Sequence, residues 1–378
     1  DAGYKIGHHR KSWGPGDISN WERHPAGKKY TEGGFAEFLA ERTDDSPFCF
    51  WLGAWDPHRP YDKGTGALSG MDLDKVRLFE CFPDNKIVRS DVADYYYEVQ
   101  RFDTLVAGAI KLLEETGELE NTIIVVTGDH GMPFPRCKAN NYDSGARIPL
   151  AIRWGSGIKK TGRILDDFVS TTDIAPTFLE LAGVDIPEVM TGQSLKNLLE
   201  SQKDGFVDTR NRSYVLHGKE RHVPCQEEHM GGYPTRAIRN HDYLYIRNFE
   251  PDRWPNGTPN YLKAAIPYCW LGDCDNGLTK TYMVENKEKD DHHRNLWELS
   301  FGKRPAEELY DCRKDPEQLV NLAGEPEYAE IKEKLAGQLM EQLEITADPR
   351  VVGGAEAFDK APYLGQGPRH PSYRPDSE

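Results

Sequence analysis

Short apolar runs and helical repeats alternate along the first half of the chain. The apolar or β-branched runs have the length of strands, and they cover residues 48–52, 122–127 and 148–153. The run Thr122–Thr127 is typical of a strand buried on both faces of a parallel sheet. Apolar residues at helical spacing predict helices over Gly34–Arg42, Asp94–Glu115 and Thr171–Ala182. This alternation predicts an α/β fold with a doubly wound, mostly parallel sheet.

From about Ser213 the pattern changes. Strand-like runs at Tyr214–His217 and Tyr243–Phe249 alternate with Gly/Pro-rich loops, and apolar residues follow one face of a helix over 326–345. This predicts a smaller antiparallel sheet closed by a helix. The residues after Asp348 are rich in Gly and Pro, and we expect them to wrap the surface or to be poorly ordered. We therefore divide the chain into an α/β domain over 1–212, a subdomain over 213–347 and a tail over 348–378.

Composition and charge exclude several kinds of partner. The chain has 378 residues, of which 38% are hydrophobic and 29% charged, as in an ordinary globular protein. No apolar stretch reaches about 18 residues, so a membrane span is not predicted. The net charge of −15 argues against nucleic acid or an anionic membrane as the main partner. A local cluster of cations can still bind an anionic substrate. Composition does not indicate the oligomeric state.

The seven cysteines are too few and too irregularly spaced for a small disulfide scaffold. Cys269 and Cys274 are close enough in sequence for a bridge. The absence of a C-x-x-C pair gives no support for a zinc ribbon. Two triplets, which begin at Asn211 and Asn256, fit the N-glycosylation pattern, although such triplets are common by chance.

Polar residues with metal- and anion-binding chemistry directly follow the run Thr122–Thr127. Asp129 and His130 come at the end of this predicted strand, where ligands bind in open α/β sheets. Arg136 and Lys138 follow on a loop with two prolines. Metal-type ligands followed by fixed cations suit a small anion bound to a metal. An ordinary turn with solvent-facing cations would produce the same short pattern.

A second loop, Asp56-Pro57-His58-Arg59-Pro60, follows the predicted strand Phe48–Leu52. Its prolines make the loop rigid and hold His58 where the strand ends, which makes this histidine a candidate for function as well as for a structural role. Near the start, Lys11 ends a basic group that also fits a solvated surface.

These motifs together resemble one family, the sulfatases of the alkaline-phosphatase-like superfamily. The resemblance covers nearly the whole chain and is carried by Ala2–Lys11, Asp56–Pro60, Thr127–Gly131, Lys138, Tyr142–Leu150, Thr172–Thr177, Gly192–Leu195, Glu308–Asp311, Asp315-Pro316 and Asn321-Leu322. Three phrases, Trp13–Asp17, Met132–Arg136 and Glu220–His222, resemble most the branch with N-sulfoglucosamine sulfohydrolases and bacterial glycan sulfatases. The resemblance implies a sulfated oligosaccharide or polysaccharide as substrate.

The resemblance also implies roles for individual residues. Asp129 and His130 match calcium ligands, although an imidazole is an unusual donor for so hard a cation. Lys11 and Lys138 match lysines that hold sulfate oxygens, and His58 matches the histidine beside the leaving group, where it would act as general acid. The family often has a histidine two positions after Lys11, where this chain has Trp13.

The candidates for binding the sugar come from the same resemblance. They are Arg136, Glu220, Arg221 and His222.

The family's nucleophile is a formylglycine made from a C/S-x-P/A-x-R motif, which this sequence does not contain. The paired aspartates that complete the family's calcium site are not found either. We expect both upstream of Asp1, with this chain as the downstream part of a longer enzyme or as an inactive relative. Without a nucleophile we expect no turnover of sulfate esters by the chain alone.

Two other functions stay open. One is a phosphoesterase or phosphonate hydrolase on the same fold, and the other is a non-catalytic carbohydrate-binding relative. The sugar, the position of its sulfate and the choice between S–O and S–N cleavage are also open. A bacterial glycan sulfatase would be periplasmic or secreted.

Overall fold

A computed structural model describes residues 2–13, 17–42, 44–227, 229–365 and 367–374. The chain forms two compact units. The first unit comprises residues 1–76, 92–123 and 154–156, and the second comprises 77–91, 124–153 and 157–378. Within the described ranges, no helix is both long and apolar enough to cross a membrane.

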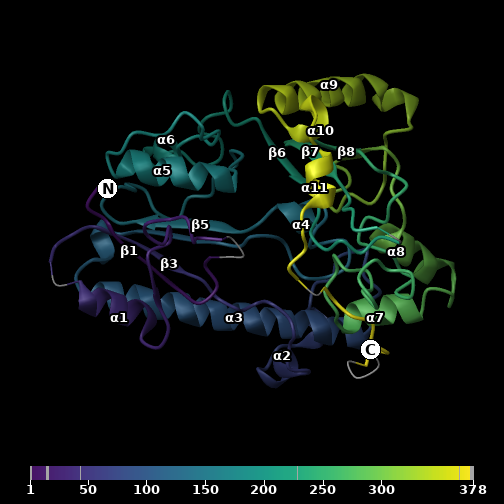
Figure 1. Ribbon diagram of the computed structural model, residues 1–378, viewed down its shortest axis with the longest axis horizontal. Helices are drawn as coiled ribbons and strands as arrows, with labels where there is room; N and C mark the ends of the chain where they lie inside the picture. Colours follow the sequence, from purple (N-terminus) through teal and green to yellow (C-terminus); the bar gives the residue numbers. More distant parts are fainter. Residues whose placement is uncertain (1, 14–16, 43, 228, 366, 375–378) are drawn as a thin grey trace. The chain divides into compact units, whose positions relative to one another are not determined.

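The first unit is built on a three-stranded parallel sheet. Its strand order is β2-β1-β3, and its strands are β1 (Lys5–His9), β2 (Lys28–Tyr30) and β3 (Phe48–Leu52). Helix α1 (Gly34–Glu41) lies beside this sheet (Figure 1). Phenylalanine rings make the contact between them. The ring centroids of Phe35 and Phe38 each lie 4.8 Å from that of Phe50. Alternate residues of β3 point to the opposite face of the sheet from α1, and Trp51 among them is 62% exposed.

The carboxyl ends of β1 and β3 lie side by side, because His9 pairs with Leu52. The chain then passes Lys11 directly over Gly53. A Cβ atom on Gly53 would lie 1.6 Å from the Lys11 carbonyl oxygen, so only glycine fits there. The Trp51 indole also donates a hydrogen bond of 3.2 Å to this oxygen. The segment with Lys11 is therefore fastened to the end of β3.

Helix α3 (Lys86–Glu115) begins eight residues earlier than the sequence pattern predicts. The Asn85 side chain caps it by accepting hydrogen bonds from the backbone N–H groups of Ile87 and Val88. The buried face of α3 includes the charged residue Glu98, whereas the apolar residue Val99 is 37% exposed. Short helical turns complete this part of the chain, namely α2 (Thr65–Leu68), η1 (Leu73–Lys75) and η2 (Leu119–Asn121).

The next two strands correct the prediction of one doubly wound sheet. Strands β4 (Ile123–Thr127) and β5 (Leu150–Trp154) form a two-stranded sheet of their own. The residues of β4 are only half-buried, because β4 has β5 as its single described neighbour. The helical segments that follow are α4 (Asp143–Ala146), η3 (Thr171–Asp173), α5 (Ile174–Leu181) and α6 (Lys196–Glu200).

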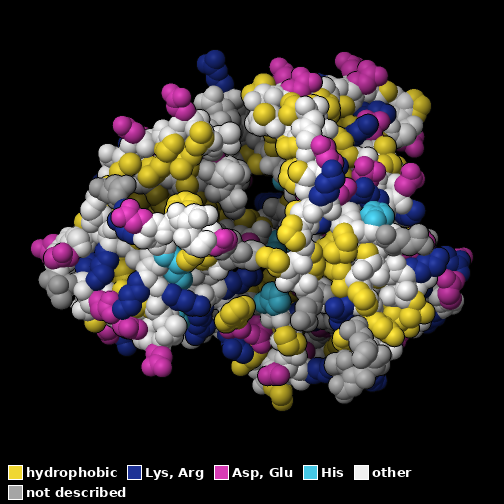
Figure 2. Space-filling view, in the orientation of Figure 1, with side chains coloured by type: hydrophobic (Ala, Val, Ile, Leu, Met, Phe, Trp, Pro, Cys, Tyr) yellow, Lys and Arg dark blue, Asp and Glu magenta, His cyan; other side chains and the backbone are white. Residues whose placement is uncertain are grey.

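The second unit also contains a four-stranded antiparallel sheet in the order β6-β7-β8-β9. Its strands are β6 (Tyr214–Lys219), β7 (Thr235–Asn240), β8 (Tyr243–Asn248) and β9 (Glu307–Asp311). After η4 (Pro326–Tyr328), helix α9 (Ala329–Ile345) covers this sheet, as Figure 1 shows. Leu335, Leu339 and Leu343 pack against Ile238 and Tyr245. Acidic side chains lie along the outer side of α9 (Figure 2).

Helices α7 (Leu278–Glu285) and α8 (Asp291–Phe301) enclose a second apolar cluster around Trp270 and Trp297. The tail forms α10 (Pro349–Val352) and α11 (Glu356–Lys360) and then returns to the same unit. The His370 ring stacks on Tyr261 at 3.7 Å, so the described part of the tail wraps the surface.

Two sequence features do not have the role that their pattern allows. All seven cysteines are free, so Cys269 and Cys274 are not bridged. Asn256 is 1% exposed and donates a hydrogen bond to the Ser300 carbonyl oxygen, which removes it as a glycosylation site.

We predict that Gly53→Ala lowers the free energy of unfolding by at least about 1–3 kcal/mol, because the added methyl group collides with the Lys11 backbone. Gly108→Ala is the matched control, since Gly108 lies within α3 and has open space around it. The control should stabilise the protein by about 0.5–1 kcal/mol through helix propensity. Urea unfolding followed by circular dichroism measures both, and equal stabilities of the two variants would refute the close approach.

We predict that Leu339→Ala costs about 2–5 kcal/mol of stability, because this side chain of α9 is fully buried against the antiparallel sheet. Ile345→Ala, on the same helix at a side chain that is 68% exposed, should stay within about 0.5 kcal/mol of the parent protein. Thermal and urea unfolding of the two variants compare them directly. A small effect of Leu339→Ala would mean that α9 does not cover the sheet.

Candidate functional site

In the first unit, Lys11 and His58 follow the ends of the adjacent strands β1 and β3. Both side chains are exposed. The His58 backbone N–H donates to the Trp55 carbonyl oxygen at 2.7 Å, and the Nδ1 atom of His58 lies 2.5 Å from the Arg59 carbonyl oxygen. Because a carbonyl can only accept, Nδ1 carries the proton. The Nε2 atom is then the one that gains or loses a proton.

A cavity of about 310 Å³ opens beside His58 within the first unit. The loop after β3 and helix α3 form its walls, with charged side chains of both signs. The residues that line it are Trp55, Asp56, His58, Arg59, Pro60, Asp62, Glu98 and Arg101. An exposed indole next to ionic groups is suited to contact with a sugar ring and its polar substituents.

In the second unit, Asp129 and His130 follow β4 as the sequence predicts. The Asp129 side chain is 72% exposed, whereas that of His130 is 30% exposed. The His130 Nδ1 atom lies 2.6 Å from the Gly131 carbonyl oxygen, and Nε2 lies 3.6 Å from Asp129 Oδ1. Burial lowers the pKa of His130, and the positive charges of Lys138 and His222 act in the same direction. His130 is therefore neutral at physiological pH and lies within electrostatic range of both.

Lys138 is buried and paired with an acid far away in sequence. Its Nζ atom lies 2.8 Å from Asp275 Oδ2, and the two side chains are 8% and 16% exposed. An ammonium group has three N–H donors, and the described contacts of Lys138 use one of them. The remaining donors can bind the oxygens of an anion without loss of the ion pair.

The acid that holds Lys138 belongs to a loop over residues 270–276, which we call the acidic loop. Asp273 in this loop accepts a hydrogen bond of 2.8 Å from Lys219 and lies 3.3 Å from His222 Nδ1. Burial alone would raise the pKa of Asp273, but Lys219 and His222 hold it well below its usual range. The acidic loop thus presents the Asp273 carboxylate to Lys219 and the Asp275 carboxylate to Lys138.

Lys280 fixes the acidic loop from inside the protein. Its ammonium group donates to the carbonyl oxygens of Trp270, Leu271 and Cys274 and to the Asn276 side chain, over 2.7–3.2 Å. Burial lowers the pKa of Lys280 to about 8. These four acceptors favour the charged form at neutral pH.

Sequence reasoning missed Asp273, Asp275 and Lys280. The Gly-Asp-Cys-Asp-Asn run indicates a turn, but no local signal connects it to Lys138, which precedes Asp275 by 137 residues.

Three of the predicted sugar-binding residues are used inside the fold. Arg136 is 2% exposed, donates to the carbonyl oxygens of Leu299 and Gln318 and stacks on Tyr142 at 3.7 Å. It therefore has no access to a sugar as placed here.

Glu220 and Arg221 also bind other parts of the chain. The Glu220 carboxylate bonds to Arg236 and Arg350 at 2.6 and 2.7 Å. Arg221 donates to the backbone of Asp359 and to that of Ala361, which fastens the tail. The remaining member of the group, His222, has a 42% exposed side chain and faces Asp273.

The donors around Asp129 do not make up a calcium site. Within the part of the chain that the structure describes, no three His, Cys, Asp or Glu side chains are grouped to hold a metal ion. Calcium takes about six to eight oxygen ligands, whereas this place offers one carboxylate and one imidazole. No chemical step is therefore assigned to a metal here.

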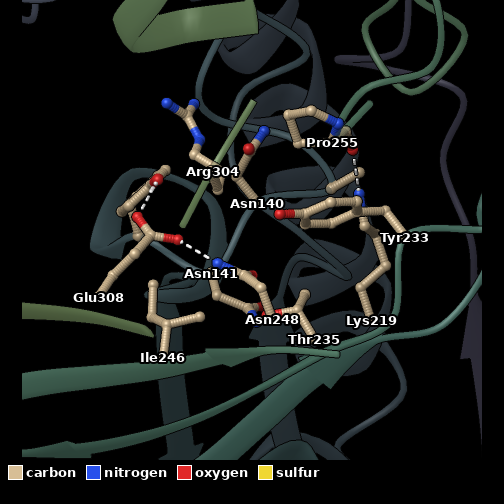
Figure 3. A pocket seen from close by; sticks show the side chains of 12 residues that line it. Asn140, Asn141, Lys219, Tyr233, Thr235, Ile246, Asn248, Pro255, Arg304 and Glu308 are labelled. Carbon is tan, nitrogen blue, oxygen red and sulfur yellow. Dashed lines mark hydrogen bonds between the residues drawn. The ribbon is translucent and has the colours of Figure 1, made fainter. Parts of the chain in front are cut away.

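A smaller cavity of about 20 Å³ lies against one face of the antiparallel sheet and is shown in Figure 3. Asn141, Tyr233, Asn248 and Glu308 are among the residues that line it. The Tyr233 hydroxyl is buried and has no hydrogen-bond partner among the described residues. This volume suits one water molecule and excludes a sugar.

Two family models match the chain. The model described as Sulfatase matches residues 19–184, and the one described as N-sulphoglucosamine sulphohydrolase, C-terminal, matches residues 128–254.

Curated relatives have similar names. An ulvan-active sulfatase of Formosa agariphila is 29% identical over 76% of this chain and 44% of its own length. The human N-sulphoglucosamine sulphohydrolase is 25% identical over 82% of this chain and 62% of its own length. The chain thus spans about half the length of the curated relatives it matches.

Solved structures support the fold. A structure described as a sulfatase from Bacteroides fragilis matches with a TM-score of 0.55 at 20% identity, over 86% of this chain and 59% of that one. A structure in complex with its substrate, D-glucosamine-2-N,6-O-disulfate, matches with a TM-score of 0.54 at 21% identity, over 83% and 69%. These neighbours are sulfatases of the alkaline-phosphatase-like fold. Together the two family models span residues 19–254, and with the curated relatives they make this chain similar to the sulfatases.

Proposed function

We propose that this chain is part of a sulfatase-type hydrolase that removes sulfate from a sulfated glycan. The matching family models and the names of the relatives support this proposal. The relatives include N-acetylglucosamine-6-O-sulfatase of Bacteroides thetaiotaomicron as well as the ulvan and glucosamine enzymes. The observation that carries it is Lys138, a buried ammonium group with donors to spare beside His130 and His222. A sulfate group matches that set of donors.

Cleavage of a sulfate ester or sulfamate needs three contributions: a nucleophile at sulfur, cations on the sulfate oxygens and a proton for the departing oxygen or nitrogen. In the second unit we assign the second contribution to Lys138, which would neutralise the charge that grows on the oxygens. In the first unit Lys11 is a separate candidate for a cation of this kind. We assign the third to His58, whose Nε2 atom would donate the proton while Nδ1 stays bonded to the Arg59 carbonyl oxygen.

The nucleophile is not assigned to any residue of this chain. Sulfatases generally use calcium and formylglycine, and the 378 residues contain no C/S-x-P/A-x-R motif. The roles proposed here are therefore limited to substrate binding and proton transfer. Asp129 and His130 are proposed as a partial metal-binding pair that needs further oxygen ligands.

We predict sulfate-dependent binding of glycans by the chain itself. Calorimetry should show binding of heparin-derived or ulvan oligosaccharides and none of their chemically desulfated counterparts. Lys138→Ala should weaken binding about 10- to 100-fold, the worth of one or two charge-assisted hydrogen bonds. Lys160→Ala is the control, because Lys160 forms an exposed pair with Asp204.

A second variant separates the loss of glycan binding from a loss of stability. Lys138→Ala removes the cation that pairs with the buried Asp275 carboxylate, so Lys138→Ala combined with Asp275→Asn should restore stability but not binding. Equal binding of sulfated and desulfated glycans, or full binding by this double variant, would contradict the proposed function.

We predict that His58 acts on the leaving group. In a polypeptide that holds these residues together with a formylglycine motif, His58→Ala should lower kcat for a sulfated sugar by about 10²- to 10⁴-fold. The loss should be small with 4-nitrophenyl sulfate, because its leaving group needs no proton. Equal losses on both substrates would exclude a general acid, and no sulfate release by the parent protein would favour a non-catalytic binding role.

A further inference from the structure

The loop that carries His58 is joined to helix α3 by two acidic side chains. Asp56, two residues before His58, forms a hydrogen bond with Glu98 of α3. Glu98 is 5% exposed. Two carboxyl groups can share a hydrogen bond only when one of them holds a proton. This contact therefore depends on protonation.

Arg101, one helical turn further along α3, lies beside both acids. Its Nε atom is 3.3 Å from Asp56 Oδ2, and its Nη1 atom is 3.4 Å from Glu98 Oε2. One guanidinium group can neutralise one of the two carboxylates. When both are ionised, Arg101 balances one of them, while Asp62 and Arg59 of the same cavity add one charge of each sign. One negative charge then stays uncompensated between the loop and the helix.

The segment that follows the loop is attached to α3 by Asp94, which accepts hydrogen bonds of 2.9 Å from the backbone N–H groups of Gly64 and Gly66. The His58 backbone bonds to Trp55, and the Tyr61 hydroxyl donates to the Pro57 carbonyl oxygen at 3.0 Å, so both contacts lie within the loop. The ring centroids of Tyr61 and Tyr95 are 6.3 Å apart, which is a packing contact between the two rings. The acid pair and Arg101 join α3 to the part of the loop directly before His58.

The groups that face Glu98 set its titration. Burial and the hydrogen bond with Asp56 raise the pKa of Glu98 to about 7, the charges of Asp56 and Asp62 act in the same direction, and Arg101 opposes them. The folded protein thus holds this proton up to a higher pH than the unfolded chain does. It follows that the contact stabilises the protein at low pH and is lost as the pH rises through about 7.

We propose that Glu98 and Arg101 are positioning residues for His58. The proton shared by Asp56 and Glu98 holds the loop against α3, and loss of this proton releases the loop. The catalytic consequence rests on the role proposed for His58. The attachment of the loop does not, because it concerns only contacts within the first unit. Glu98 acts through Asp56 and touches no substrate.

The attachment can be tested on the chain itself, with Trp55 as the reporter, because it lines the same cavity and does not titrate. The measurement is the NMR shift of the Trp55 indole N–H between pH 5 and 9, in a His58→Gln background that removes the imidazole titration. We expect a step centred near pH 7. Adding Glu98→Gln should abolish it, since the amide donates to Asp56 at every pH.

The control is Glu114→Gln, which changes an exposed glutamate of the same helix and should leave the step unchanged. Arg101→Met should shift the step to higher pH, because it removes the charge that favours ionised Glu98. A step that persists after Glu98→Gln, or its absence in the His58→Gln protein, would overturn the proposal.

Kinetics separate this proposal from the proposed function. In a polypeptide that also holds a formylglycine motif, Glu98→Gln should move the alkaline limit of kcat upward by about one pH unit or more and leave KM unchanged. If the Trp55 step depends on Glu98 but His58→Ala does not alter turnover, the attachment stands and the catalytic role of His58 is wrong. If turnover needs His58 but not Glu98 at any pH, the positioning role is wrong.

Discussion

A buried ammonium group is stable only when it is paired, and the second unit is arranged around this constraint. Lys138, Lys219 and Lys280 all lie in its interior. The acidic loop supplies a carboxylate to each of the first two, while its own carbonyl oxygens accept from the third. Loss of one partner of such a pair costs about 3–5 kcal/mol, because a charge is left behind without water. The acidic loop therefore couples the folding of this unit to the site around Lys138.

The same arrangement explains how Lys138 can bind an anion. An ammonium group held by one carboxylate keeps its charge and its direction, and its other donors stay available. The neutral His130 and the partly exposed His222 lie in the same electrostatic environment. In the first unit, the parallel pairing of β1 and β3 places two strand ends together. Gly53 has no side chain, so the Lys11 backbone can pass directly over it. Each unit thus presents its polar groups where strands end.

The sequence predicts local elements well where one periodicity dominates. The bounds of β3 and nearly those of α1 follow from their apolar residues, and the α9 face follows from Leu335, Leu339 and Leu343. It fails where the signal is mixed. Strand β1 is hidden by its histidines, which hydrogen-bond to the backbone of neighbouring segments. The first turns of α3 were missed because Asn85, a loop residue by composition, serves as the cap.

The candidate site divides in the same way. Residues on single loops, such as Asp129, His130, Lys138 and His58, are candidates because of their motifs, and their roles stay predictions. Their partners could not, because Asp275 and Glu98 come from segments far along the chain. Arg136 shows the opposite error, since a basic residue in a predicted binding loop turns inward to bond two backbone carbonyl groups. Burial depends on the tertiary fold, and local sequence does not reveal it.

The most direct measurement of the central claim is a crystal structure of the chain grown with a sulfated glucosamine disaccharide. The account predicts sulfate oxygens within hydrogen-bond distance of the Lys138 Nζ atom, with the Asp275 ion pair still formed on the other side of the ammonium group. A disaccharide bound elsewhere, with Lys138 enclosed by protein alone, would contradict the account.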